Sequence, residues 1–323
     1  MDTKQKNRLM WQVPFLVLLI IGTVLIIRQQ QSEPYQHNKG FVFGTIYNVT
    51  YQSSEDLQAE IEAEMKKVDL EFSMYNDSST VARINRGEMV KGSAMFDELF
   101  QLSQTINKET DGAFDITVAP LVNAWGFGFK HEQMPTPQQV DSLLKIRDQL
   151  DFSAIAKGFG SDVVARLLRS HGIQNFMVEI GGEVVTQGIS DKRLPWKIGV
   201  TKPTDDSLSV SGELQTVLNV TDIAMATSGN YRKFYYKGGR KYAHTIDPKT
   251  GYPVQHSLLS ATVLAKDCAV ADAYATAFMV LGMDRAKEVL GRHPELMAYF
   301  IFATPEGGLD VWFSPSMKDK IAE

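Results

Sequence analysis

The sequence predicts an α+β fold, with one mixed domain at residues 41–323 behind a hydrophobic N-terminal segment. Three observations favour this fold class. Stretches of strand-like alternation and helix-like periodicity follow one another without a repeat. After residue 40, no run rich in Pro, Gly or Ser divides the chain. Before that point, the seventeen residues from Trp11 to Ile27 carry no charge.

The composition excludes several classes of protein. The chain has 323 residues, of which 44% are hydrophobic and 22% charged, so it can bury a sizeable core and is not disordered. Its single cysteine, Cys268, rules out a disulfide scaffold. The formal net charge of -5 argues against non-specific binding of nucleic acid, which needs a basic face. We therefore expect a globular protein with no nucleic-acid partner.

The uncharged segment Trp11–Ile27 predicts a transmembrane helix. At 1.5 Å per residue it is about 26 Å long, close to the ~30 Å thickness of the hydrocarbon layer. A cleaved signal peptide is the alternative, but no small-x-small cleavage site follows the segment. A lipoprotein anchor is excluded because no cysteine lies nearby.

Basic residues predict the orientation of this helix. Lys4, Lys6 and Arg8 precede it, whereas Arg28 is followed by no further Lys or Arg until Lys39. Because cytoplasmic flanks carry the excess of positive charge, the N-terminus is expected in the cytoplasm. The expected order is a cytoplasmic N-terminus (1–10), a transmembrane signal-anchor (11–27), a polar tether (28–40) and the folded domain (41–323) on the periplasmic side of the cell inner membrane.

The first half of the domain is expected to hold one strand and three helices. Alternating apolar residues favour a strand at Phe41–Tyr51. Apolar residues at helical spacing favour amphipathic helices at Ser54–Leu70, Ala94–Lys108 and Gly160–Ser170. Gly172 suits the left-handed position that often ends a helix. Loops and turns are expected at Asp111–Thr117 and Trp125–Phe129.

The second half is expected to consist mainly of strands. Gly238 and Gly239 mark a hairpin turn. One helix is expected at Val270–Leu281, and Gly282 closes it. Strands are predicted at Phe176–Ile180, Trp196–Val200, Leu214–Val220, Tyr231–Tyr236, Lys241–Thr245, Leu259–Ala265, Tyr299–Ala303 and Leu309–Phe313.

Two glycine-containing segments could approach a phosphate. Gly181 and Gly182 follow a predicted strand, and Lys157 with Gly158 opens a helix. Such backbone can come close to a ligand, and a helix N-terminus offers N–H groups to an anion. Neither segment has the spacing of a dinucleotide-binding or P-loop motif. By itself, each is also explained as an ordinary turn.

Asp272 and Thr276 lie four residues apart on one face of the predicted helix. A carboxylate and a hydroxyl placed together can hold a hard cation such as Mg²⁺. The alternative is structural: Asp272 could stabilise the helix dipole, and Thr276 could bond to a main-chain carbonyl.

Four further residues have an ordinary structural explanation. His244, before a turn, could be a general base or a hydrogen-bonded structural histidine. Asp115 could simply bond to loop N–H groups. Cys268 is expected to be a small buried residue, and Trp125 to belong to the core or to a pocket wall.

Nine blocks, in order along the chain, resemble one family, the FAD:protein FMN transferases (ApbE-type flavin transferases). The blocks extend from about Phe41 to Gly282 and are more specific together than any one of them. They read FGTIYNVTY, SMYNDSSTVARIN, TDGAFDITVAPLVNAWGFG, DFSAIAKGFGSDVV, MVEIGGEVVTQG, WKIGV, IAMATSGNYRKF, YAHTIDPKTGYP and ADAYATAFMVLG.

The resemblance implies an α+β fold with two lobes around a cleft for FAD, with Mg²⁺ at its pyrophosphate. It implies that FMN passes from FAD to a threonine hydroxyl of an acceptor protein, which forms a phosphoester and releases AMP. His244 is then the best acceptor for the threonine proton, and Asp272 a weaker one because the metal would occupy it. The implied metal ligands are Asp272, Thr276 and the carbonyl of Ala154; the implied flavin-binding residues are Phe43, Tyr75, Ala113, Phe114, Asp115, Asp151, Lys157, Glu179, Ser228 and His244.

Two features depart from the family pattern. Phe43 stands where the family usually has methionine, and the apolar segment stands in place of a lipoprotein cysteine. The acceptor implied by the resemblance is an extracytoplasmic redox subunit with a motif Asp-x-x-Ser/Thr-Gly-Ala-Thr, which this chain lacks. Two other functions stay open: a metal-dependent FAD pyrophosphatase, and a membrane-tethered flavin-binding protein without catalysis.

Overall fold

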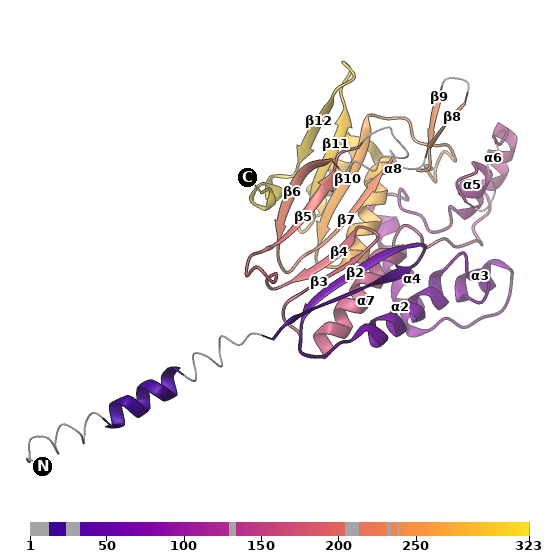
Figure 1. Ribbon diagram of the computed structural model, residues 1–323. Coiled ribbons are helices and arrows are strands. Elements are labelled where there is room, and N and C mark those ends of the chain that lie inside the picture. The colour runs from indigo at the N-terminus through magenta and orange to yellow at the C-terminus, as the bar shows by residue number, and fades with distance from the viewer. Residues whose placement is uncertain are drawn as a thin grey trace, which may run out of the picture.

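An eight-stranded antiparallel sheet forms the centre of the molecule (Figure 1). The computed structural model describes residues 13–23, 33–128, 134–203, 213–230, 234–237 and 240–322. The strands of the sheet are, in spatial order, β1 (Tyr35–Val42), β2 (Thr45–Gln52), β3 (Phe176–Ile180), β4 (Glu183–Gln187), β7 (Ala224–Gly229), β10 (Leu258–Ala265), β11 (Met297–Ala303) and β12 (Leu309–Phe313).

The first two strands form a hairpin where the sequence predicted one strand. Phe43 and Gly44 make the turn, with φ of 51° and 73°. Because a non-glycine residue seldom adopts a positive φ, the Phe-Gly pair gave no turn signal. The last part of the predicted tether, Tyr35–Gly40, lies in β1, so the prediction of a tether is wrong for these residues.

A smaller antiparallel hairpin covers one face of the central sheet. It consists of β5 (Trp196–Thr201) and β6 (Leu214–Val220), both close to their predicted bounds. Its apolar side chains form one buried cluster with those of β4, β7, β10 and β11, including Ile198, Leu218 and Tyr299. The β5–β6 hairpin is therefore a separate layer of the fold. A short 3-10 helix, η1 (Pro315–Lys320), adds Met317 to the same cluster.

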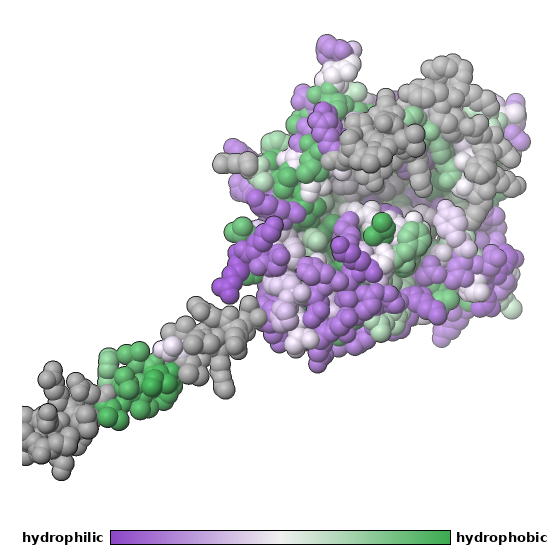
Figure 2. Space-filling view, in the orientation of Figure 1, coloured by the Kyte–Doolittle hydropathy of each residue, from purple (hydrophilic) through white to green (hydrophobic). Residues whose placement is uncertain are grey.

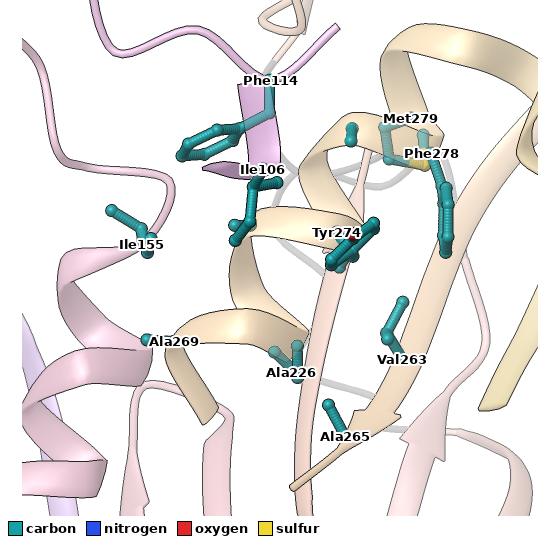
Figure 3. Close-up of a cluster of buried hydrophobic side chains, with 14 of the residues drawn as sticks. Ile106, Phe114, Ile155, Ala226, Val263, Ala265, Ala269, Tyr274, Phe278 and Met279 are labelled. Carbon is teal, nitrogen blue, oxygen red and sulfur yellow. The ribbon is translucent and has the colours of Figure 1, made fainter. Parts of the chain in front are cut away.

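Helices cover the other face of the sheet (Figure 1). Two long helices pack directly on the strands, and two more pack on those helices. Side chains from this layer and from the sheet, such as Ile106, Tyr274 and Val263, meet in a buried cluster (Figure 3). The α+β fold class is thus confirmed. The helices are α2 (Gln58–Phe72), α3 (Thr80–Asn85), α4 (Ala94–Glu109), α5 (Ala119–Ala124), α6 (Pro137–Leu143), α7 (Ala156–Ser170) and α8 (Cys268–Arg292).

Local hydrogen bonds explain where two of these helices begin. Helix α2 begins four residues later than predicted because the side chains of Ser53 and Asp56 bond to the N–H groups of Glu55 and Gln58. Helix α4 begins as predicted, after Ser93, whose hydroxyl accepts the N–H of Phe96.

Helix α8 is longer than predicted and is kinked at Gly282. The glycine has φ 73° and interrupts the helix as expected, but the chain resumes helical structure afterwards. The ring N–H of His256 donates to the carbonyl of Met279 at 2.8 Å, and the same ring packs against Gly282. His256 therefore satisfies a carbonyl that the kink removes from the helical pattern.

Residues 13–23 form a helix whose surface is apolar (Figure 2). Within the described residues, no helix has both the length and the apolar character needed to cross a membrane. The remaining residues of the predicted transmembrane segment, 11–12 and 24–27, lie outside the described ranges.

Asp162 of α7 fixes the first turn of α8. Its carboxylate accepts the main-chain N–H groups of Cys268 and Ala269, both at 2.9 Å. These N–H groups have no partner inside their own helix. Burial raises the pKa of Asp162 to about 7, although the two hydrogen bonds act in the opposite direction. The contact holds α8 in place one turn before Asp272.

We expect the stability of the wild type, relative to Asp162→Asn, to fall as the pH rises. The pKa of Asp162 is about 7 in the folded protein, against about 3.9 in an unfolded chain. Between these values the folded protein keeps a proton that the unfolded chain has released, so the free energy of unfolding decreases with pH in that window. Asparagine does not titrate. Urea unfolding of both proteins at about pH 5 and about pH 7.5 measures this difference. If the free energy of unfolding changed equally with pH in the wild type and in Asp162→Asn, the prediction would be contradicted.

Candidate active site

A cleft of about 1310 Å³ opens beside the central sheet. Its walls come from the turns of the β1–β2 and β3–β4 hairpins, from β5, from the beginning of α7 and from α8. All thirteen residues that sequence analysis singled out as site residues line this one cleft: Phe43, Tyr75, Ala113, Phe114, Asp115, Asp151, Ala154, Lys157, Glu179, Ser228, His244, Asp272 and Thr276.

Asp272 lies at the inner end of the cleft, where it is 3% exposed. Its Oδ2 accepts the main-chain N–H of Gly158 at 3.1 Å. Burial raises the pKa of Asp272. Thr276, one turn further along α8, shares a hydrogen bond of 3.1 Å with the hydroxyl of Ser228 on β7. The predicted pair therefore does face one side of α8, toward the cleft.

The contact between Asp272 and Gly158 depends on a close approach of α7 to α8. A Cβ atom on Gly158 would lie 2.7 Å from the carbonyl carbon of Cys268 and 2.9 Å from the main-chain nitrogen of Ala269. Both are backbone atoms and cannot rotate aside. Glycine is required here because a side chain would separate the two helices.

Lys157 forms an ion pair with Glu183 across the cleft wall. Nζ lies 2.5 Å from Oε1 of Glu183, whose side chain is 3% exposed, whereas that of Lys157 is 33% exposed. Burial alone would lower the pKa of Lys157, but the charges of Asp272 and Glu183 outweigh it, so the pKa is raised. Burial raises the pKa of Glu183. The lysine therefore keeps its positive charge at the cleft.

Glu183 is the site residue that sequence analysis missed. It begins β4, a strand that was not predicted, directly after Gly181 and Gly182. Those glycines form the turn between β3 and β4, with φ of 63° and 101°. The signal was present in the block IGGE, because a carboxylate directly after a tight turn is brought back beside the preceding strand.

Asp115 and Asp151 lie at the cleft in hydrogen-bonded loops. Asp115 accepts the N–H and the hydroxyl of Thr117 through Oδ1, and its Oδ2 lies 2.7 Å from Nη1 of Arg147. Asp151 accepts the N–H of Ser153 at 2.8 Å. Phe114, which directly precedes Asp115, is buried. Asp115 is thus both the loop acid that the ordinary explanation predicts and a residue of the cleft wall.

Three further predicted residues line the cleft with different exposures and contacts. Tyr75 is 78% exposed. Glu179, on β3, accepts a hydrogen bond from Asn48 of β2 at 2.9 Å. Phe43 packs its ring against Gly160 of α7, where a Cβ atom would lie 2.7 Å from Cε2. Phe43 thus covers the first turns of α7 from the β1–β2 turn.

His244 follows β9 (Arg240–Ala243), which pairs with β8 (Phe234–Lys237) as predicted, although residues 231–233 and 238–239 are outside the described ranges. Its ring makes an edge contact with Phe127, with ring centres 6.4 Å apart. Trp125 is buried and donates to the carbonyl of Gly251 at 2.7 Å, and Cys268 is buried, both as expected.

Three oxygen donors in the lining of the cleft fit a hard cation. Asp272 supplies a carboxylate, Thr276 a hydroxyl and Ala154 a main-chain carbonyl, and all three line the cleft. Oxygen ligands of this kind suit Mg²⁺, which also keeps several waters. Among the described residues there is no group of three or more His, Cys, Asp or Glu side chains that could hold a metal.

Sequence comparisons agree with the resemblance. The sequence model of the ApbE family matches residues 43–300. A FAD:protein FMN transferase of Haemophilus influenzae is 38% identical over 305 residues, which cover 83% of this chain and 86% of that protein. The FAD:protein FMN transferase of Escherichia coli K12 is 33% identical over 302 residues, covering 85% and 84%.

Solved structures show the same fold. The flavin transferase ApbE of Vibrio cholerae aligns with a TM-score of 0.79 at 33% identity, covering 89% of this chain and 100% of that chain. The apo form of the Pseudomonas stutzeri flavinyl transferase ApbE aligns with a TM-score of 0.80 at 28% identity, covering 90% and 97%. The resemblance identified from the sequence blocks is confirmed, and the chain belongs to the ApbE family.

Proposed function

We propose that this protein is a FAD:protein FMN transferase, which moves FMN from FAD to a threonine hydroxyl of an acceptor protein. The observation that carries the proposal is the cleft, which gathers the thirteen expected site residues from segments far apart in the sequence. Relatives named FAD:protein FMN transferase match more than four fifths of the chain.

In the proposed reaction, the threonine oxygen bonds to the phosphorus of the FMN half of FAD. The pyrophosphate bond to the AMP half breaks, and AMP leaves with the bridging oxygen. The reaction needs the attacking and leaving oxygens in line, and it needs the phosphate charge neutralised. The ammonium of Lys157, held at the cleft wall by Glu183, supplies part of that neutralisation.

We propose Mg²⁺ as the cofactor, held by Asp272, Thr276 and the carbonyl of Ala154. When bound, it would neutralise phosphate oxygens as a Lewis acid. The fixed position of Asp272 supports this assignment, since Gly158 orients the carboxylate from the side of α7.

We propose that His244 accepts the proton of the attacking threonine hydroxyl. An imidazole can accept a proton near neutral pH, and His244 lines the cleft next to Phe127. Asp272 is the weaker candidate because metal binding would occupy its carboxylate.

Mass spectrometry of an acceptor peptide tests the function. After incubation with the full-length protein, FAD and Mg²⁺, the peptide should gain the mass of an FMN phosphoester at threonine, and AMP should appear in equal amount. Release of FMN and AMP without peptide modification would favour a pyrophosphatase. Binding of FAD without AMP release would favour a flavin-binding protein.

Lys157→Ala should weaken FAD binding. A charged hydrogen bond to phosphate is worth about 1.5–3 kcal/mol, so the dissociation constant should rise about tenfold or more. Titration of flavin fluorescence measures it, and Lys108→Ala, on the exposed end of α4, is the matched control. An unchanged affinity would leave Lys157 only a structural role.

We also propose that residues 11–27 anchor the protein in the inner membrane, with the catalytic domain on the periplasmic side. The absence of charge in this segment and the basic residues before it support this arrangement. The acceptor would then be a periplasmic redox subunit that carries the flavinylation motif.

Reporter fusions after Glu323 test the orientation. A reporter that works only outside the cytoplasm should be active, and one that works only inside should be silent. The opposite pattern would refute both the orientation and the periplasmic acceptor.

A further inference from the structure

Two buried carboxylates act on one ammonium at the inner end of the cleft. Nζ of Lys157 contacts Oε1 of Glu183 at 2.5 Å. The charge of Asp272 acts on the same ammonium. Both carboxylates are 3% exposed, so water offers them little solvation and each gains from a nearby cation. Whichever carboxylate holds the ammonium is less available to any other cation.

In the structure, the Lys157 ammonium pairs with Glu183. Asp272 instead accepts the neutral N–H of Gly158 and faces the cleft beside Thr276. Glu183 has its own constraints: Ser161 donates to its main-chain carbonyl at 3.1 Å, and its Oε2 is buried without a hydrogen-bond partner. Loss of Lys157 would leave Glu183 as an uncompensated buried charge, so this ion pair is strongly favoured.

We propose that Glu183 is a positioning residue that holds the Lys157 ammonium away from Asp272 and thereby keeps the Asp272 carboxylate available to Mg²⁺. The inference rests on the Mg²⁺ site of the proposed function. It assigns to Glu183 a role in cation binding although Glu183 itself need not contact the metal.

Removing the charge of Glu183 should move the Lys157 ammonium toward Asp272. In Glu183→Gln the shape is kept, but the amide oxygen attracts the ammonium less strongly than a carboxylate does. Asp272 is then the remaining buried anion near Lys157, so the ammonium pairs with it. Mg²⁺ must displace that ammonium before it can bind.

Calorimetric titration of the full-length protein in detergent with Mg²⁺, in the absence of FAD, tests this competition. Glu183→Gln should raise the dissociation constant for Mg²⁺ about tenfold or more. Adding Lys157→Met to Glu183→Gln should restore it to within about threefold of the wild type, because the competing ammonium is gone. Glu183→Asp, which keeps the charge, should lie between the wild type and Glu183→Gln.

Glu98→Gln is the matched control. It removes a carboxylate from the half-exposed ion pair with Arg166, on the outer side of α4 and α7, and should not change Mg²⁺ affinity. Circular dichroism of each variant checks that the fold is kept.

The outcomes separate the inference from the proposed function. Mg²⁺ binding by the wild type with equal affinity in Glu183→Gln would overturn the inference alone. Weak binding in Glu183→Gln that Lys157→Met does not restore would also overturn it, since the loss would then be structural. A wild type that binds no Mg²⁺ would overturn the metal site and this inference together.

Discussion

Asp272→Asn should reduce FMN transfer at least ~100-fold at millimolar Mg²⁺, a loss of about 3 kcal/mol of transition-state stabilisation. The substitution keeps the shape of the side chain, and the amide oxygen can still accept the N–H of Gly158. It removes the negative charge on which a hard cation depends. The loss should therefore lie in metal binding, and raising the Mg²⁺ concentration should restore part of the activity.

The stability of Asp272→Asn distinguishes this explanation from a purely structural one. Burial of the Asp272 carboxylate is unfavourable, as its raised pKa indicates, so a neutral amide should leave the melting temperature of the metal-free protein nearly unchanged. Thermal unfolding followed by circular dichroism checks this. Full activity with an unchanged dependence on Mg²⁺ would remove the metal from the mechanism.

Thr276→Val provides a graded comparison. A neutral hydroxyl contributes less to a cation than a carboxylate, so this variant should be less impaired than Asp272→Asn. In the double variant, the loss of transition-state stabilisation should be smaller than the sum of the two single losses, because both residues act through one ion.

Local patterns in the sequence predicted much of this site. Asp272 and Thr276 were paired by their spacing of four residues, and the structure places both on the cleft side of α8. Apolar residues at helical spacing predicted a helix from Ala94, and α4 begins at that residue. In each case the interacting groups lie within one or two turns of helix, so the sequence contains the whole interaction.

Contacts between distant residues could not be predicted in the same way. Lys157 and Glu183 are 26 residues apart, and Gly158 and Asp272 are 114 residues apart. No periodicity connects such pairs; only the packing of α7 against β4 and α8 brings them together. The family resemblance supplied the position of Lys157 but gave no reason to single out Glu183.

Two strands were missed for a related reason. β7 reads AMATSG and is composed mainly of small residues, and β4 is buried along most of its length. Neither shows the alternation of a strand with one exposed face, because β5–β6 covers one side and helices cover the other. The β1–β2 turn was missed because its first residue, Phe43, has a positive φ that its type does not signal.

Gly158→Ala should impair both the fold and the reaction, although it adds a single methyl group. The new Cβ would lie 2.7 Å from the carbonyl carbon of Cys268, and the carbonyl oxygen of Cys268 is another close neighbour. These are backbone atoms at the first turn of α8, which Asp162 holds in place, so the strain cannot be relieved by a side-chain rotation.

We expect Gly158→Ala to lower the free energy of unfolding by about 1–3 kcal/mol, as overpacking of a tight contact does. FMN transfer should fall by roughly 100-fold, because a displacement of about 1 Å between α7 and α8 weakens the hydrogen bond by which Gly158 orients Asp272. Urea unfolding and mass spectrometry of the flavinylated acceptor measure the two effects.

Gly291→Ala is the control for glycine replacement in a helix. No atom lies within 4 Å of a Cβ at Gly291, which lies near the exposed end of α8. Alanine has the higher helix propensity, so this variant should be as stable as the wild type or more stable by up to about 1 kcal/mol. If Gly158→Ala behaved like Gly291→Ala in both assays, the close approach of α7 and α8 would not be what orients Asp272.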